Sequence, residues 1–193
     1  QKVDNQPCIC PGGMMNMIIT DIMERTGASW PAAHSDAEQM ATLTYELNQA
    51  GGFENYGVPF CMTVEAEAMG ATVDMGDVQT EPHVVDSPLS SATQIGQLAP
   101  FSLSQGRIPT VLAAIRILKA KGSAVPVIAN ITGPVSVAGT LVDMTPLLME
   151  LRKKPEACHQ LMTLITDNLI SYGHAQVEAG ADAICIAEPS GTG

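Results

Sequence analysis

Polar and small residues that follow predicted strands are the strongest candidates for chemistry in this sequence. Glu188 comes directly after the apolar run Ala183–Ala187, and Asn130 and Gly133 stand at the end of the apolar run 125–131. In parallel α/β folds the C-terminal ends of the strands share one edge of the sheet, where active sites lie. A carboxylate there can ligate a metal or orient a metal ligand. We therefore predict Glu188 as a catalytic residue; the alternative is a loop acid that caps a neighbouring helix.

Four further positions are predicted to bind substrate near the same edge. Asn130 and the Gly133 backbone end one strand, although Asn130 could equally be a buried amide that pairs with a neighbouring strand. Cys61 and Glu65 lie at the end of another apolar run, residues 53–62, and could line the mouth of a pocket. For Glu65, and for Glu67 beside it, the alternative is an exposed loop acid.

A glycine pair near the N-terminus offers a different kind of binding site. Gly12 and Gly13 separate a predicted strand at residues 7–10 from a predicted helix at residues 14–25. Backbone N–H groups at the start of a helix attract negative charge, so this turn could hold an anion such as a sulfonate. The alternative is a plain tight turn that needs glycine for its backbone angles.

The cysteines and histidines do not form a recognisable metal site. Cys8 and Cys10 would supply only half of the usual four zinc ligands, and alternate strand residues of this kind fit a barrel core better. The four histidines show no paired ligand spacing. Five cysteines, an odd number, indicate reduced thiols rather than a disulfide framework.

Composition describes a globular chain and excludes several classes of function. Of 193 residues, 46% are hydrophobic and 15% are charged, which excludes disorder. No uninterrupted apolar run is long enough to predict a membrane span, and the polar N-terminus does not resemble a signal peptide. A net charge of −11 makes nucleic acid an improbable partner. These features together predict a cytoplasmic protein.

The order of the predicted elements indicates parallel βαβ construction. Gly180 ends the last long helix, and Ser35 with Glu38 forms a predicted capping box. A small hairpin is expected outside the sheet at residues 72–75 and 82–85. Four strands are predicted at residues 7–10, 53–62, 125–131 and 183–187, and helices at residues 14–25, 35–50, 64–69, 109–121, 146–153 and 155–179.

Three segments resemble the uroporphyrinogen decarboxylase superfamily. Residues 57–70 end in Ala-Met-Gly, residues 130–134 carry the Gly-Pro strand end, and residues 180–190 form a strand that finishes in an acid. Together with residues 10–17 they are most similar to the methylcobamide:coenzyme M methyltransferases. The resemblance implies an α/β fold: residues 1–193 form a single partial TIM barrel domain, the N-terminal portion of the family's barrel, truncated before its zinc-ligand segment.

The same resemblance implies an activity, a cofactor and partners. A methyl group would move from a methyl-corrinoid protein to a small thiol such as coenzyme M, a reaction of methanogenesis, with zinc activating the thiol. The family's His-x-Cys zinc motif does not occur in this sequence, so the metal site is expected to be incomplete here and the chain inactive alone. Glu188 would be its only candidate ligand.

Two other functions stay open. Cys61 aligns with the aspartate that decarboxylases use to bind pyrrole nitrogens, and a thiol cannot replace that fixed anion, which disfavours a uroporphyrinogen decarboxylase. A non-catalytic half-barrel that acts as a binding module is the third hypothesis. Because a half-barrel leaves sheet edges open, a homodimer through those edges is also expected.

Overall fold

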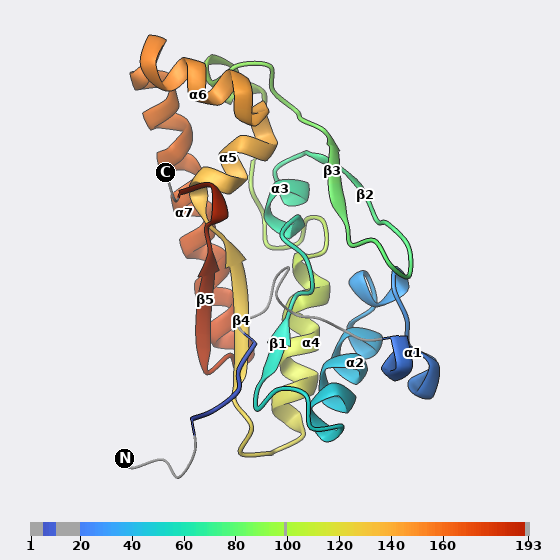
Figure 1. The fold of residues 1–193 in the computed structure, drawn as a ribbon. Coiled ribbons are helices and arrows are strands. Elements are labelled where there is room, and N and C mark those ends of the chain that lie inside the picture. Colours follow the sequence, from blue (N-terminus) through green and yellow to red (C-terminus); the bar gives the residue numbers. More distant parts are fainter. Residues whose placement is uncertain (1–5, 11–19, 99, 192–193) are drawn as a thin grey trace.

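The computed structural model of the protein describes residues 6–10, 20–98 and 100–191 (Figure 1). Its centre is a parallel sheet with the strand order β1–β4–β5. The three strands are Tyr56–Val58, Val127–Thr132 and Ala183–Ala187. Both strand pairings are parallel, as expected for βαβ units joined by helices. The predicted α/β class with parallel strands is confirmed for this sheet.

Helices cover one face of the sheet. The main ones are α2 (Ala37–Gln49), α4 (Ile108–Ala120) and α7 (Pro155–Ala179); in Figure 1, α7 lies behind β4 and β5, and α4 and α2 lie on the side of β1. Ile131 of β4 and Ile184 of β5 both point toward Gly173 of α7, where their Cδ1 atoms lie 3.7 Å and 3.4 Å from the position of an added β-carbon. The opposite side of these strands therefore carries Asn130, Thr132 and Cys185, because side chains alternate along a strand.

Several of the remaining elements lie around the C-terminal ends of the strands. The predicted hairpin is confirmed: β2 and β3 pair antiparallel and stand apart from the parallel sheet. Figure 1 shows α5 and α6 above the ends of β4 and β5. The bounds are α1 Thr20–Thr26, η2 Ala32–His34, α3 Val64–Ala68, β2 Thr72–Asp74, β3 His83–Asp86, η3 Ala92–Gln97, α5 Pro134–Val142, α6 Met144–Lys153 and η4 Pro189–Gly191.

The strand predicted at residues 7–10 is wrong. Residues 7–10 lie beside the start of β1, but the side chain of Asn55 makes hydrogen bonds that a strand would make through its backbone. Cys10 N donates to Asn55 Oδ1 at 2.7 Å, and Asn55 Nδ2 donates to the Cys10 carbonyl at 2.6 Å. Glu54 N donates to the Cys8 carbonyl at 2.8 Å. Side-chain amides that bond the backbone in this way compete with a regular strand ladder.

Two local predictions about helices also need correction. The cap of α2 is Asp36 rather than Ser35, since the Asp36 carboxylate accepts from Gln39 N at 3.0 Å while Ser35 ends the short helix before it. Helix α5 was not predicted; Gly133 caps it and Pro134 occupies its first turn. The predicted helix at 14–25 lies partly outside the described residues, and its described end belongs to α1.

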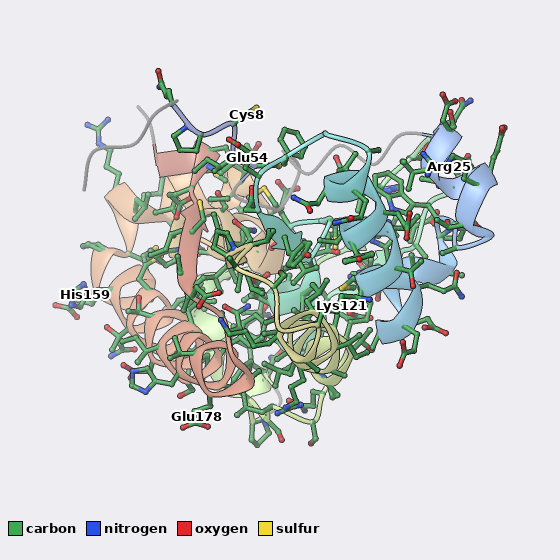
Figure 2. The ribbon with its side chains drawn as sticks, turned by 90° about the horizontal axis from the view of Figure 1, so that it is seen from below. Cys8, Arg25, Glu54, Lys121, His159 and Glu178 are labelled. Carbon is green, nitrogen blue, oxygen red and sulfur yellow. The ribbon has the colours of Figure 1, made fainter. Side chains whose placement is uncertain are left out.

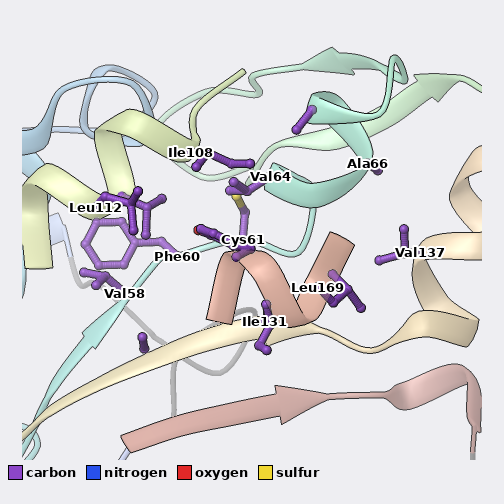
Figure 3. Packing of buried hydrophobic residues seen from close by; sticks show 14 of the residues in the cluster. Val58, Phe60, Cys61, Val64, Ala66, Ile108, Leu112, Ile131, Val137 and Leu169 are labelled. Atoms are coloured by element: carbon purple, nitrogen blue, oxygen red, sulfur yellow. The ribbon is translucent and has the colours of Figure 1, made fainter. Parts of the chain in front are cut away.

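The hydrophobic core lies between the sheet and its helices. Figure 3 shows how Val58 and Phe60 from β1 and the turn after it meet Leu112 of α4 beside Cys61. The predicted stripe of α4 is buried throughout, whereas charged groups such as Arg25, Lys121 and Glu178 project from the helices (Figure 2). Among the described residues, no helix combines the length and the apolar character that a membrane span requires.

Candidate active site

A cavity of about 380 Å³ lies at the C-terminal ends of the three parallel strands. Met62 and Thr63 follow β1, Thr132 ends β4, and Pro189 and Ser190 follow β5. The cavity therefore occupies the edge where the sequence placed the site. Its wall is completed by the hairpin and by helices α5 and α6 through Glu81, Pro82, His83, Val84, Ser136, Gly139, Thr140 and Met144.

The lining of the cavity is apolar with a set of hydroxyl groups. Thr63, Thr132, Ser136, Thr140 and Ser190 supply these hydroxyls. The hairpin adds one carboxylate and one imidazole, and burial raises the pKa of the Glu81 carboxyl. Apolar walls with a few polar groups are typical of sites that bind small molecules.

Glu65 does not line the cavity but binds Thr132, which does. It lies in the first turn of α3, only 1% exposed, and accepts hydrogen bonds from Thr132 N at 2.8 Å and Thr132 Oγ1 at 2.9 Å. Burial raises the pKa of the Glu65 carboxyl, and the hydrogen bonds from Thr132 offset only part of this effect. The contact fixes the end of β4 against α3, so Glu65 is not the exposed loop acid of the alternative interpretation.

Glu188 reaches the N-terminus of α5. Its carboxylate accepts from Val135 N at 2.8 Å and Ser136 N at 2.9 Å, and the Ser136 hydroxyl donates to it as well. A β-carbon on Gly133 would lie 2.3 Å from Glu188 Oε2, so glycine permits this approach. A carboxylate in this place satisfies free N–H groups and complements the helix dipole. Both carboxylate oxygens are already engaged with α5.

Cys61 contacts a buried arginine that the sequence reasoning missed. Arg107 Nη1 donates to Cys61 Sγ at 3.2 Å, Nη2 donates to Thr63 Oγ1 at 2.6 Å, and Nε donates to Glu67 Oε2 at 2.7 Å. Burial lowers the pKa of Arg107, but Cys61 and Glu67 more than offset this, so the net shift is upward. Arg107 therefore stays charged directly below the cavity residue Thr63.

The position of Arg107 in the sequence is unusual and could have drawn attention to it. Arg107 directly precedes α4, where its positive charge opposes the positive end of the helix dipole. A lone arginine in front of an apolar helix needs a compensating partner, and Glu67 forty residues earlier supplies it. The partner itself could not be inferred, because the two residues meet only after the chain folds.

Asn130 lies deeper than the cavity residues. It is 1% exposed, and its carboxamide forms no hydrogen bond within the described part of the chain. Its backbone carbonyl accepts from Gln176 Nε2 at 3.2 Å, and its register partner on β5 is Cys185. The alternative interpretation, in which its amide pairs with a neighbouring strand, is not observed. Gly12 and Gly13 lie outside the described residues.

The described residues do not fit a zinc site. Within residues 6–10, 20–98 and 100–191 no group of three or more His, Cys, Asp or Glu side chains could hold a metal ion. The Glu188 oxygens are engaged by α5, and Cys61 lies against the Arg107 cation.

Comparison with known proteins places this arrangement in a family. A sequence model described as "Uroporphyrinogen decarboxylase (URO-D)" matches residues 1–193. The chain belongs to the uroporphyrinogen decarboxylase family. A solved methyltransferase from Methanosarcina mazei superposes with a TM-score of 0.90 at 37% identity, covering 98% of this chain and 56% of that protein. The predicted partial TIM barrel of uroporphyrinogen decarboxylase type is thereby confirmed.

Within this uroporphyrinogen decarboxylase family the similar curated proteins include both methyltransferases and decarboxylases. Methylcobamide:CoM methyltransferase MtaA of Methanosarcina barkeri is 37% identical over 89% of this chain and 51% of its own length. MtbA of Methanosarcina acetivorans is 35% identical over 98% of this chain and 55% of its own length. A uroporphyrinogen decarboxylase of Myxococcus xanthus is 34% identical over 64% of this chain. The chain thus spans about half the length of these methyltransferases.

Proposed function

We propose that this chain forms part of an enzyme that moves a methyl group from a methyl-corrinoid protein to a small thiol such as coenzyme M. The observation that carries the proposal is the similarity to MtaA and MtbA, which extends over 89% and 98% of the chain. The names of both relatives give a methylcobamide as donor and coenzyme M as acceptor. The similarity to a decarboxylase covers less of the chain.

The environment of Cys61 favours methyl transfer over decarboxylation. A decarboxylase of this family would need a fixed carboxylate there to accept several N–H donors. Cys61 is 1% exposed, and its sulfur already accepts from Arg107 Nη1 and Thr63 Oγ1. This buried and already engaged sulfur cannot accept several N–H donors from a porphyrinogen, so decarboxylation remains the second candidate, supported by the family and by the Myxococcus xanthus relative.

In the proposed reaction the methyl group moves from cobalt to the sulfur of the thiol. The thiol loses its proton, a sulfur–carbon bond forms, and the carbon–cobalt bond breaks with its electron pair remaining on cobalt. We propose that the cavity residues hold the thiol and exclude water, and that the Asn130 carboxamide, with the backbones of Gly12 and Gly13, binds the substrate's polar end; the Gly133 backbone is already bonded to Ala187 and Val137. Glu65 and Glu188 hold Thr132 and Ser136 in the cavity wall.

The zinc ion of the proposed reaction would be bound by residues outside the described part of the chain. A zinc ion lowers the pKa of a bound thiol, which would favour the attacking thiolate. Because the described residues do not make a zinc site, we propose that the ligands belong to the part of the relatives that this chain does not match. The chain alone is then expected to be inactive.

Location and assembly are also proposals. An odd number of cysteines, five, supports a reducing compartment such as the cytoplasm. The outer edge of β5 and the neighbouring face of α7 border an apolar groove of about 450 Å³ that includes Ile170, Val177 and Ile186. We propose that two chains pair through this groove when nothing else covers it.

Complementation tests the proposed function. The 193-residue chain is mixed with the portion of Methanosarcina acetivorans MtbA that lies beyond the matched region, and zinc content and methyl transfer from free methylcobalamin to coenzyme M are measured. We expect methyl transfer from the mixture but from neither part alone, and zinc only where the MtbA portion is present. Release of carbon dioxide from uroporphyrinogen instead would support the decarboxylase, and no activity with either substrate would support a non-catalytic module.

A matched pair of variants makes the assay specific to the cavity. Glu188→Gln removes the charge that holds Ser136 and the start of α5, whereas Glu178→Gln makes the same change on the outer surface of α7. We expect methyl transfer to fall only in the first variant. Equal activity of both variants would contradict the placement of the site.

A further inference from the structure

The outer face of α6 combines exposed apolar side chains with unpaired cations. Leu148, Met149 and Leu151 are 57%, 53% and 46% exposed. Arg152 and Lys153 follow them, and neither forms an ion pair within the described part of the chain. We call these five residues the α6 face. Apolar residues that gather on a surface beside cations are typical of protein interfaces, in which Met and Arg are enriched.

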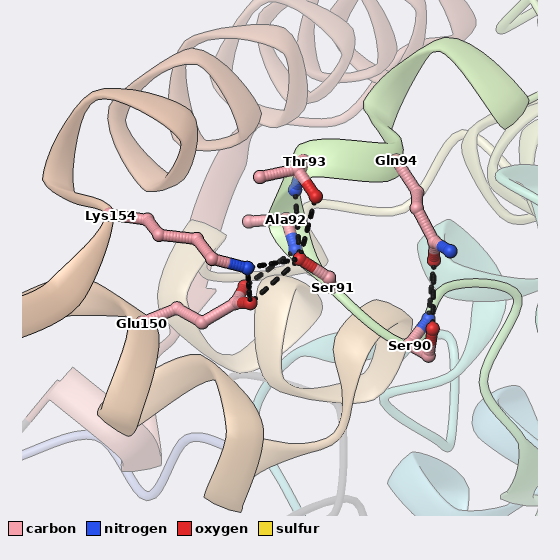
Figure 4. A network of polar contacts seen from close by, with 7 residues as sticks. All are labelled: Ser90, Ser91, Ala92, Thr93, Gln94, Glu150 and Lys154. Carbon is pink, nitrogen blue, oxygen red and sulfur yellow. Dashed lines mark hydrogen bonds and ion pairs between the residues drawn. The ribbon is translucent and has the colours of Figure 1, made fainter.

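The inner side of α6 is held firmly in place. Leu147 is buried, and the Glu150 carboxylate accepts from Ser91 Oγ at 2.7 Å, Ala92 N at 2.8 Å and Lys154 Nζ at 2.7 Å (Figure 4). These hydrogen bonds, first that from Lys154, lower the pKa of Glu150 to about 2, so the network persists at neutral pH. A helix anchored in this way presents its outer face rigidly, which reduces the entropy cost of binding.

The α6 face borders the candidate active site. Met144, the first residue of α6, lines the cavity, and α6 lies beyond the C-terminal ends of β4 and β5 (Figure 1). The face begins four residues later, which corresponds to roughly 6 Å along a helix axis. A molecule bound to the α6 face would therefore lie at the rim of the cavity.

We infer that the α6 face docks the protein that carries the methyl-corrinoid, and that the docking surface of this partner is apolar with a rim of carboxylates. The inference rests on the proposed function. A corrin ring with its side chains is too large for a cavity of about 380 Å³, so the methyl group must be presented from outside, at the rim. Arg152 and Lys153 are free cations in a chain of net charge −11, and they mark where an acidic partner would be attracted.

A second copy of this chain fits the α6 face poorly. A symmetric contact places the same patch on both sides of the interface, so it would gather Arg152 and Lys153 of both copies in one interface. Like charges in contact oppose association. The groove beside β5 and α7 lacks this obstacle, because Ile170, Val177 and Ile186 are uncharged.

Binding measurements with matched variants test the docking. The 193-residue chain and a purified methyl-corrinoid protein are studied by biolayer interferometry at two salt concentrations. We expect Met149→Ser and Arg152→Glu each to raise Kd about tenfold, as for residues central to an interface, with Arg152→Glu also weakening the salt dependence. The controls make the same changes elsewhere: Val78→Ser, 47% exposed and outside the groove beside β5, and Arg116→Glu on α4. Equal effects in variants and controls, or no binding by the parent chain, would overturn the inference.

A comparison of two methyl donors separates docking from chemistry. In the complemented enzyme, Met149→Ser and Arg152→Glu should slow transfer from the methyl-corrinoid protein and leave transfer from free methylcobalamin unchanged. If the complemented enzyme without substitutions transfers no methyl group from either donor, the proposed function is refuted instead. If the two variants fail to combine with the MtbA portion, that portion covers α6, and the docking proposal is wrong.

Discussion

The Glu188 carboxylate lies over Gly133, where an added β-carbon would come within 2.3 Å of Glu188 Oε2. Gly133→Ala must therefore displace Glu188 from Val135 and Ser136 or shift the backbone. We expect the free energy of unfolding to fall by about 1–3 kcal/mol, the usual cost of overpacking. Urea denaturation measures this effect. Gly96→Ala is the control, because a β-carbon there meets no atom within 4 Å, and an equal loss in both variants would contradict the contact.

His34 makes the fold sensitive to acid. Its ring is fully buried beside Trp30 and Phe60, and neither ring nitrogen has a hydrogen-bond partner in the described part of the chain. Burial, and secondarily the charge of Arg107, lowers the pKa of His34 to about 3. The unfolded chain then binds the extra proton between pH 6.5 and 3, so the free energy of unfolding falls as the pH decreases through this range.

A substitution isolates the contribution of His34. The slope expected from one proton is about 1.4 kcal/mol per pH unit. His34→Leu should remove this slope, whereas His159→Leu, on the exposed surface of α7, should keep it. Chemical denaturation from pH 7 to pH 5 measures both variants. If His34→Leu is as sensitive to acid as the parent chain, other groups cause the dependence.

Arg107, at the start of α4, joins that helix to residues 61–67, about forty positions earlier in the sequence. Its guanidinium bonds Cys61, Thr63 and Glu67, and it is 5% exposed. Arg107→Met leaves Glu67 without its cation and should lower the free energy of unfolding by about 3 kcal/mol, as for a broken buried ion pair. Arg25→Met is the control, because its 3.9 Å ion pair with Glu46 is exposed and is expected to contribute less than about 1 kcal/mol. Thermal unfolding that is equal in both variants would contradict this view.

The parts of the fold that could be predicted from the sequence are those with local signals. Helix α7 was predicted at its observed bounds, because Pro155 starts it and Gly180, at φ +113°, ends it. The apolar runs of β4 and β5 were likewise sufficient to place those strands and the edge of the sheet that carries the cavity. The predicted strand at residues 7–10 failed because Asn55, far along the chain, bonds its backbone instead.

The candidate site was predictable only in outline. Strand-end position drew attention to Glu65 and Glu188, whose functional roles stay predictions, and what each carboxylate binds depends on residues more than fifty positions away, Thr132 and Ser136. The hydrophobic periodicity of a sequence carries no information about contacts between residues so far apart in the chain. The hairpin residue His83 was overlooked for the same reason: only the folded chain brings it across to the ends of the parallel strands.

The open edge of β5 provides the last prediction. Ile186 is 62% exposed and lines the groove beside α7, so pairing of two chains would bury it. We expect the parent chain to sediment as a dimer and Ile186→Asp to sediment as a monomer, because a charge buried in an apolar contact lacks a partner. Val85→Asp, at a similarly exposed position on β3, should remain dimeric. A parent chain that is monomeric at high concentration would refute the dimer, and the MtbA portion should compete for the same edge if it completes the barrel.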